Sequence, residues 1–300
     1  MLGERQLLQS TARLESIMDI HNWLNQCADV KKEIDNHGNL FVDLGNLKWV
    51  SPIGISVLLS TLNYFDNVYC LKTESPELGE PDRLDVIGYM ERMNFFQLCP
   101  PDVRESFEMS HDMAQYYKRN RNNKVEELDE LKVSKVDEDI IDLDKSVKNI
   151  MKAKGLHKNR ITDIAGIVTE LGQNAVEHTG TDCYSCVQYY RETYSRRKRV
   201  EIAICDSGQG IVKSLKDHIK SIDNDDVIKQ AIFTRATSLP EQDRGKGLMD
   251  VKQTTFDWAS DAEFYVRTHD SAYRIHQDRL ELLDRGKYFN GTYYYIVINV

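Results

Sequence analysis

Residues 160–179, RITDIAGIVTELGQNAVEHT, constrain the fold of this chain more than any other stretch. Their apolar positions recur at helical spacing, which predicts an amphipathic helix with one face in a core. Glu170, Asn174 and His178 are each four residues apart, so they share one face of that helix. A carboxylate, an amide and an imidazole in one row suit a binding site, although a solvated polar face has the same pattern. The motifs that follow in the chain decide between these interpretations.

The composition indicates a soluble globular protein and argues against two classes of partner. The formal net charge is −9, and nucleic-acid binding depends on Lys and Arg neutralising phosphates. No apolar run reaches the roughly 18 residues of a membrane span, and the first residues lack the apolar core of a signal peptide. The six cysteines are scattered, which predicts reduced thiols and a cytoplasmic location. Cys183 and Cys186 form a single C-x-x-C, and we expect them to be ordinary strand residues rather than a metal or redox site.

Three hundred residues exceed what one core usually needs, so we expect two domains. Composition places the first domain at 1–118, a polar linker at 119–135 and the second domain at 136–300. The elements expected in the first domain are a helix over 4–34, a strand over 39–44, a helix over 54–65 entered through Ser51 and Pro52, a strand over 68–71 and a helix over 84–97. Those expected in the second are helices over 138–154, with Gly155 as its cap, and 225–233, strands over 183–190 and 199–205, a hairpin over 262–277 and a closing strand over 291–300.

The stretch FVDLGNLKWVSPIGISVLL, residues 41–59, resembles a STAS domain, the fold of bacterial anti-sigma-factor antagonists. The likeness lies in a strand, a turn and a helix start that contains glycine. Many members of that family carry a phosphorylatable Ser immediately before this glycine, where the present chain has Ile53 before Gly54. Ser51 and Ser56 lie nearby but outside that position. The resemblance therefore implies a docking module rather than a phosphate acceptor.

Two glycine motifs follow the 160–179 helix. The first is DSGQGI, residues 206–211, at the end of a predicted strand; an Asp followed by two glycines lets the backbone approach a flat ligand while the carboxylate accepts from an amine. The second is RGKGLMDVK, residues 244–252, where glycines at a helix start and a Lys favour an anion site. Neither matches a P-loop or a dinucleotide fingerprint. Residues 213–243 between them have the length of a mobile cover.

In this order, the E-x-x-x-N-x-x-x-H helix, the D-x-G-x-G after a strand, the cover and the G-x-G-L resemble the motifs of Bergerat-fold ATPases. That superfamily includes gyrase, the ninety-kilodalton heat-shock chaperone, histidine kinases and MutL. The likeness covers residues 124–300. It implies an α/β protein in which a STAS-like βαβ domain precedes a two-layer α/β sandwich that binds ATP.

The resemblance implies ATP and Mg²⁺ as cofactors and gives each motif residue a role. Asn174 would ligate Mg²⁺, Glu170 would be the general base, and His178 would lie near the phosphates. Asp206 would accept from the adenine amino group. The remaining nucleotide contacts would come from Gly208, Gly210, Ile211, Arg244, Gly245, Lys246, Gly247 and Leu248. Many relatives carry a third glycine where this chain has Met249, so the grip on the phosphates departs from the family pattern.

Among these ATPases, the chain resembles a compact, anti-sigma-factor-like switch. His111 and His157 lack the context of a histidine-kinase phospho-acceptor, and the closing strand is not followed by the transducer domain of the clamp ATPases. Some relatives of the switch type are serine kinases that act on STAS partners. Three hypotheses stay open: a protein serine/threonine kinase, a slow regulatory ATPase, and a nucleotide-gated interaction protein without turnover. Glu170 favours the first two, because a pure binding module needs no base. A STAS-type or other regulatory protein is the expected partner, and a homodimer stays open.

Overall fold

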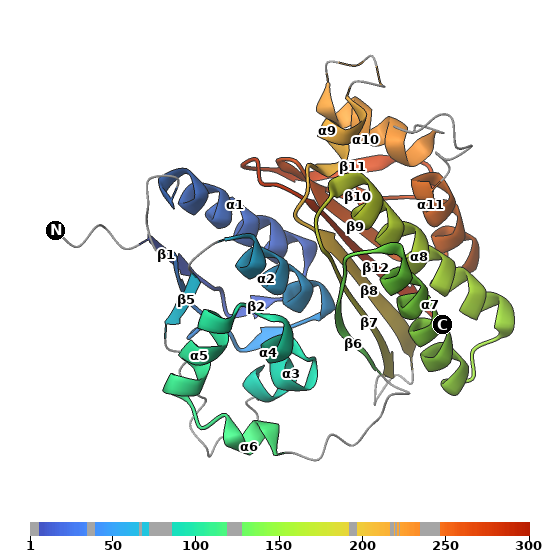
Figure 1. The fold of residues 1–300 in the computed structure, drawn as a ribbon. Helices are drawn as coiled ribbons and strands as arrows, with labels where there is room; N and C mark the ends of the chain where they lie inside the picture. The colour runs from blue at the N-terminus through green and yellow to red at the C-terminus, as the bar shows by residue number, and fades with distance from the viewer. Residues whose placement is uncertain are drawn as a thin grey trace.

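The chain folds around a seven-stranded antiparallel sheet in a mixed α/β architecture (Figure 1). The computed structural model describes residues 6–34, 40–65, 68–71, 86–118, 128–191, 197–216, 219, 221, 223–234 and 247–300. The strand order of the large sheet is β11-β10-β9-β12-β8-β7-β6. Its strands are β6 (Leu128–Ser134), β7 (Cys183–Arg191), β8 (Lys198–Asp206), β9 (Glu263–Thr268), β10 (Ser271–Ile275), β11 (Leu280–Arg285) and β12 (Thr292–Asn299).

One face of the large sheet is covered by helices of the C-terminal half (Figure 1). These helices are α7 (Asp137–Ala153), α8 (Lys158–Thr179) and α11 (Gly247–Trp258), with α9 (Gly210–Leu215) and α10 (Asn224–Phe233) at one end of the sheet. Successive side chains of β8 point into two different cores, so both faces of the large sheet are buried. Ile202 and Ile204 belong to the core beneath these helices, whereas Ala203 and Cys205 belong to a second core on the opposite face.

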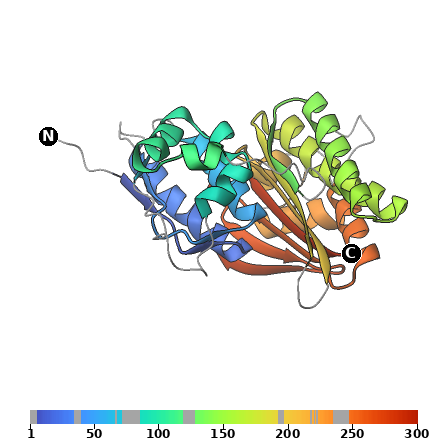
Figure 2. The same ribbon diagram turned by 90° about the horizontal axis from the view of Figure 1, so that it is seen from below.

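The N-terminal half packs against that opposite face, so the large sheet lies between it and the helices of the C-terminal half (Figure 2). It contains a parallel sheet of order β1-β3-β5 and a small β2-β4 pair. Helix α2 contacts β7, β8 and β12, and α1 contacts β9 and β10. The elements are β1 (Gln6–Gln9), β2 (Arg13–Leu14), α1 (Ile17–Ile34), β3 (Leu40–Asp43), β4 (Trp49–Val50), α2 (Pro52–Tyr64), β5 (Val68–Leu71), α3 (Val86–Arg92), α4 (Phe95–Leu98), α5 (Pro101–Ser110) and α6 (Ala114–Tyr117).

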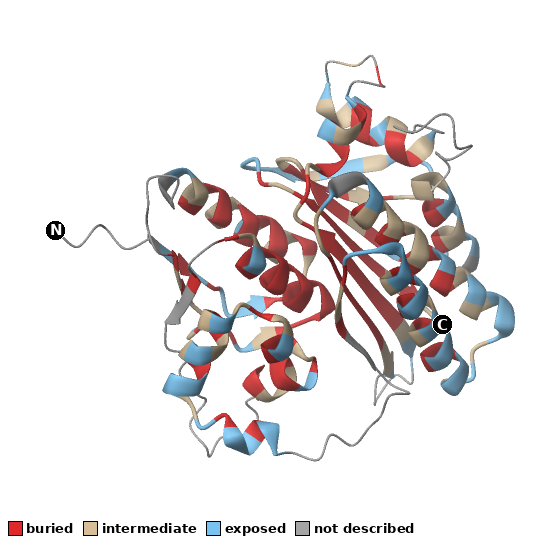
Figure 3. Ribbon diagram, in the orientation of Figure 1, coloured by how far each residue is buried: buried red, intermediate tan, exposed pale blue. Residues whose placement is uncertain are grey.

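Helix α2 is buried on all sides, and this makes it the main contact between the two halves (Figure 3). Every residue from position 52 to position 62 is buried, as expected for a helix without a polar face. Ser51 caps its start by accepting from the Gly54 N–H at 3.4 Å, and Pro52 occupies the first turn. Although apolar, α2 has 13 residues, and within the described part of the chain no helix has both the length and the apolarity to cross a bilayer.

Most of the expected elements form, and the exceptions depend on pairing with distant segments. The helices expected over 138–154 and 160–179 are confirmed, as is the left-handed Gly155 after the first of them. The helix expected over 4–34 is wrong at its start, because residues 6–14 contain β1 and β2, which pair in parallel with β3 and β4. The 84–97 helix is divided into α3 and α4 at Asn94, which has a φ of 69°.

The expected linker, 119–135, requires a correction in its second part. Residues 128–134 form β6, the edge strand that pairs with β7, and residues 119–127 lie outside the described residues. An edge strand keeps one side toward solvent, which explains its polar sequence, while Leu131 is buried. Strand β11 was not expected either, and it forms the opposite edge of the same sheet.

Replacing Gly54 with Ala should destabilise the protein, because a Cβ there would lie 1.9 Å from the carbonyl oxygen of Leu14. Backbone cannot yield as a flexible side chain can, so we expect a loss of about 2 kcal/mol or more in the free energy of unfolding. Chemical denaturation measures this loss. The matched control is Gly166→Ala on exposed α8 surface, where a Cβ has open space and should stabilise by roughly 0.5–1 kcal/mol. Equal effects of the two substitutions would contradict the packing of α2 on β2.

Candidate functional site

The described motif residues meet at one end of the large sheet (Figure 1). The C-terminal half of α8, the end of β8, the start of α9 and the start of α11 come together there, and α8 contacts both α9 and α11. Glu170 and Asn174 are half-buried, one turn apart on α8. The 160–179 helix and the two glycine motifs therefore belong to one region of the fold.

Glu170 and Gly247 are in direct contact, which joins the α8 motif to the second glycine motif. A Cβ on Gly247 would lie 1.8 Å from the Oε1 of Glu170 and 2.7 Å from its Cδ, so any larger residue there would displace the carboxyl group from this position. Gly247 is the first residue of α11, and a carboxylate is favoured at a helix N-terminus by the backbone N–H groups and the helix dipole. Leu248, the next residue, packs on the core beneath the helices.

Asp206 is a fully buried acid at the end of β8. Its Oδ1 accepts from the Gly208 N–H at 2.8 Å, and Thr292 donates to the carboxyl from both its backbone and its side chain. Burial raises the pKa of Asp206 to about 7 against the opposing effect of these donors. A carboxyl oxygen in this position can accept a further hydrogen bond from an amine on a flat ligand.

The first glycine motif is held by two residues that the sequence motifs did not include, Thr268 and Gly291. The Thr268 hydroxyl accepts from the Ile211 N–H at 3.3 Å and approaches the Gly291 carbonyl oxygen at 3.3 Å. Gly210 has a φ of 75°, and a Cβ there would lie 3.0 Å from the Thr268 hydroxyl oxygen. Gly291 has a φ of 104°, and a Cβ there would lie 2.1 Å from the backbone oxygen of Asp206. The loop and the start of β12 therefore fit together only with glycine at these positions.

The sequence carried one signal for the missed residues, the Gly291-Thr292 pair immediately before the closing strand. Thr292 pairs with both Asp206 and Thr268 in the sheet register. This cross-strand position is set by antiparallel pairing, which local spacing does not reveal. Thr268 had no comparable signal, because it ends β9 in an ordinary strand sequence.

Tyr294 lies near both the Asp206 and the Glu170 carboxyl groups. It lies on β12 and faces the same core as the covering helices. Burial raises the pKa of Tyr294 far above its usual value, and the charges of Asp206 and Glu170 both add to that increase. Both carboxyl groups thus lie within electrostatic range of one buried ring.

Several predicted site residues lie outside the described part of the structure. These are Arg244, Gly245, Lys246 and the side chain of His178. Of the expected cover, 213–243, the structure describes α9 and α10 and leaves out 217, 218, 220, 222 and 235–243.

The described side chains would form only part of a metal site. Among them there is no group of three His, Cys, Asp or Glu residues that could hold a metal ion. A Mg²⁺ ion on the Asn174 amide oxygen would need further oxygen ligands, which nucleotide phosphates and water supply. Asn174 alone would therefore not complete the coordination of such an ion.

Cys183 and Cys186 behave as ordinary strand residues, as expected. Both are fully buried in β7, and their odd spacing places them in different cores on opposite faces of the sheet. Burial raises the pKa of Cys183 well above that of a free thiol. The pair therefore cannot chelate one metal or close a disulfide across its own spacing.

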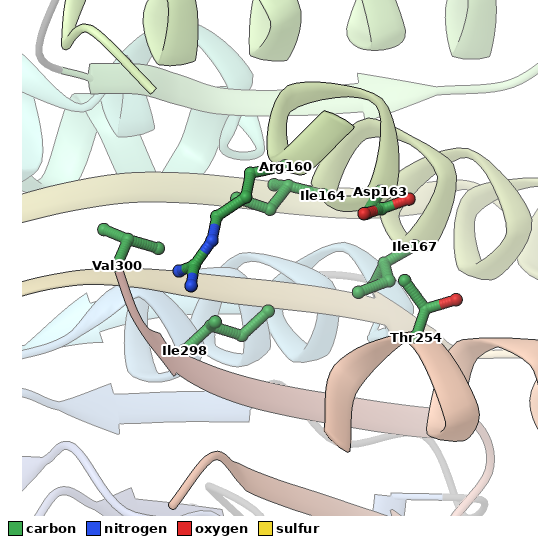
Figure 4. A pocket seen from close by; sticks show the side chains of 7 residues that line it. All are labelled: Arg160, Asp163, Ile164, Ile167, Thr254, Ile298 and Val300. Atoms are coloured by element: carbon green, nitrogen blue, oxygen red, sulfur yellow. The ribbon is translucent and has the colours of Figure 1, made fainter. Parts of the chain in front are cut away.

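A separate small pocket lies near the other end of α8, between α8, α11 and the end of β12 (Figure 4). Its empty volume is about 240 Å³, including its open mouth. The lining residues are Arg160, Asp163, Ile164, Ile167, Thr254, Ile298 and Val300. None of the predicted site residues is among them, so the pocket is distinct from the Asp206 region.

Comparisons with models of known protein families and with curated proteins found no match for this chain. The assignment of the site therefore depends on the motifs and on the contacts described above.

The raised pKa of Asp206 should make stability depend on pH. The folded state keeps this proton up to about pH 7, whereas the unfolded chain releases it near its ordinary pKa of 3.8. The stabilisation is therefore complete below pH 3.8 and is lost as pH rises through about 7. Between about pH 5 and pH 7, wild type should lose roughly 2 kcal/mol relative to Asp206→Asn, at about 1.4 kcal/mol per pH unit. Urea unfolding of both proteins at the two pH values measures this change in the free energy of unfolding. The same difference between wild type and Asp206→Asn at both pH values would contradict the burial of an ionisable Asp206.

Proposed function

We propose that the C-terminal half binds Mg-ATP at this end of the sheet in the manner of a Bergerat-type ATPase domain. The observation that carries the proposal is the joint placement of the buried Asp206 carboxyl and a Glu170 that contacts the first residue of α11. One acid suits an adenine amino group and the other lies where phosphates are expected. The order of the motifs along the chain supports the same conclusion.

In this proposal, different residues of the chain contact the base, the phosphates and the metal ion. Asp206 accepts from the adenine amine, while Gly208 and Gly210 give the base room and Ile211 packs on it. The phosphates would be received by Gly247 and Leu248 at the N-terminus of α11 and by Arg244, Gly245 and Lys246, which precede it in the sequence, with His178 as a further expected phosphate contact. Asn174 offers one oxygen to Mg²⁺. When bound, that ion neutralises phosphate charge and orients the terminal phosphate.

Glu170 supports turnover rather than binding alone. Glu170 contacts Gly247 at the helix start proposed to receive the phosphates, and from there a carboxylate could orient a water or a hydroxyl and accept its proton. We therefore favour hydrolysis of ATP, or transfer of its γ-phosphate to a protein serine or threonine, as the step that switches an interaction. A nucleotide-gated interaction protein without turnover is the alternative.

We further propose that the N-terminal half is a STAS-like docking module and that the partner is a regulatory protein. The parallel β1-β3-β5 sheet next to α1 and α2 supports this interpretation. Ser51 and Ser56 are 6% and 0% exposed, which opposes a role for either as a phosphate acceptor. The buried free thiols Cys27, Cys99, Cys183, Cys186 and Cys205 support a cytoplasmic location.

Calorimetry on the full chain should detect binding of Mg-ATP that Asp206→Ala weakens severely. The full chain is needed, because the N-terminal half covers one face of the sheet that carries the site. Truncating a buried acceptor that contacts the base should reduce affinity about tenfold or more. Asp257→Ala, an exposed acid on α11, is the control and should bind as wild type does. Unchanged affinity in Asp206→Ala would refute the placement of the adenine.

Glu170→Ala should retain ATP binding and lose turnover by roughly 10²–10⁴-fold, because a base acts on the transition state. Asn174→Ala should instead weaken the part of binding that depends on Mg²⁺. ATP labelled at the γ-phosphate reports the fate of that group as transfer to protein, release as phosphate, or neither. Glu177→Ala, exposed on the same helix, is the control. Wild type and Glu170→Ala with equal turnover would leave the gated binder as the surviving hypothesis.

A further inference from the structure

A short segment between β11 and β12 connects the N-terminal half to the candidate nucleotide site. We call residues 286–290 the strap. It follows β11 at the edge of the large sheet and leads directly into Gly291 and Thr292, the residues that contact Asp206. The strap is therefore the segment through which the chain enters β12.

Helix α1 holds the first part of the strap. The side-chain oxygen of Asn25 accepts from the Lys287 N–H at 2.8 Å. The same side chain lies so close to Gly286 that a Cβ there would be 2.3 Å from Asn25 Oδ1. The Lys287 ammonium also forms an ion pair with Asp29, one turn further along α1. One face of α1 thus fixes both backbone and side chain of the strap.

The second part of the strap is held by α1 and α2 together. The Lys31 ammonium donates to the Asn290 side-chain oxygen at 2.9 Å and also contacts the Tyr64 hydroxyl. Phe289 is fully buried, with its ring 5.1 Å from that of Tyr64. These contacts place the last strap residue before Gly291 in a fixed position.

A buried cation holds the strap from the side of the large sheet. Arg267 of β9 is fully buried and donates to the backbone oxygens of Lys287, at 2.7 Å, and Phe289, at 3.2 Å. Burial lowers the pKa of Arg267, which shows the cost of placing this charge in the core. The Tyr293 hydroxyl donates to the Asn290 backbone oxygen at 2.9 Å. The strap is therefore held on both sides, and its exit into Thr292 has little freedom.

We propose that Asn25 and Lys31 are positioning residues for the nucleotide site, which hold the strap so that Thr292 meets Asp206 and thereby set the preference for adenine. The inference rests on the proposed function for its ligand. It makes the N-terminal half a structural component of the base pocket. Loosening the strap would let Thr292 move away from the Asp206 carboxyl and would weaken the preference of that carboxyl for an amino group on the base. The contact of Glu170 with Gly247 would stay intact.

Base preference tests the proposal through the ratio of two dissociation constants. Calorimetry on the full chain compares Mg-ATP with Mg-ITP, whose base has a carbonyl oxygen in place of the amino group. In wild type at pH 8, above the pKa of about 7 for Asp206, ATP should bind at least tenfold more tightly, because the ionised carboxylate accepts from the amine and repels the oxygen. Asn25→Ala and Lys31→Met should each reduce this ratio about fivefold, as expected for one lost hydrogen bond. Asn22→Ala, exposed one turn earlier on α1, is the matched control and should keep the ratio.

A titration without nucleotide provides the second measurement. Because the Thr292 donors lower the pKa of Asp206, a loosened strap should raise that pKa further above about 7. Carboxyl NMR on wild type and the folded strap variants measures it. A general loss of stability would move neither the pKa nor the ATP/ITP ratio. If either folded strap variant keeps both at the wild-type values, the inference is wrong.

The two proposals can fail separately. Wild type that does not discriminate ATP from ITP would refute the proposed base pocket. In that case the Asp206 titration alone decides the role of the strap: a raised pKa in the variants supports it, and an unchanged pKa overturns it.

Discussion

Burial of the large sheet on both faces is the constraint on which the rest of the structure depends. All residues of β8 from Val200 to Asp206 are buried, with alternate side chains in the core beneath the helices and in the core shared with α2. Because Asp206 ends this strand, its carboxyl lies in an environment that water hardly reaches. The chemistry proposed for that acid depends on this burial, which the helix-covered face of the sheet provides, because Asp206 continues the alternation of Ile202 and Ile204.

Local sequence predicted the parts of the site that lie within single elements. The helical spacing of Glu170 and Asn174 and the glycines after Asp206 were visible because each depends on a few consecutive residues. Thr268 and Thr292 were not, since they reach the site through the pairing of β9, β12 and β8. The same reason explains β1 and β2, which need partners far along the chain, and β6, whose edge position permits a polar sequence.

Two buried charged groups on opposite faces of the sheet show different solutions to desolvation. Arg267 donates to two strap carbonyls from its terminal nitrogens, which holds the backbone there, while its buried Nε has no partner among the described residues. Asp206 has donors from Gly208 and Thr292, yet its pKa stays raised, which means that these donors do not fully compensate for burial. The ligand proposed for this site would add one more donor to that carboxyl.

The depth at which α2 is buried has a consequence for synthesis of the chain on the ribosome. Its apolar surface is complete early, yet β12, one of the strands that covers it, begins at Thr292, far beyond the end of the helix at Tyr64. At about 5–20 residues per second, that interval lasts on the order of ten seconds or more. During this time an exposed helix with no polar face would be a target for chaperones and for aggregation. The order of translation therefore makes the N-terminal half depend on protection before its own partner strands exist.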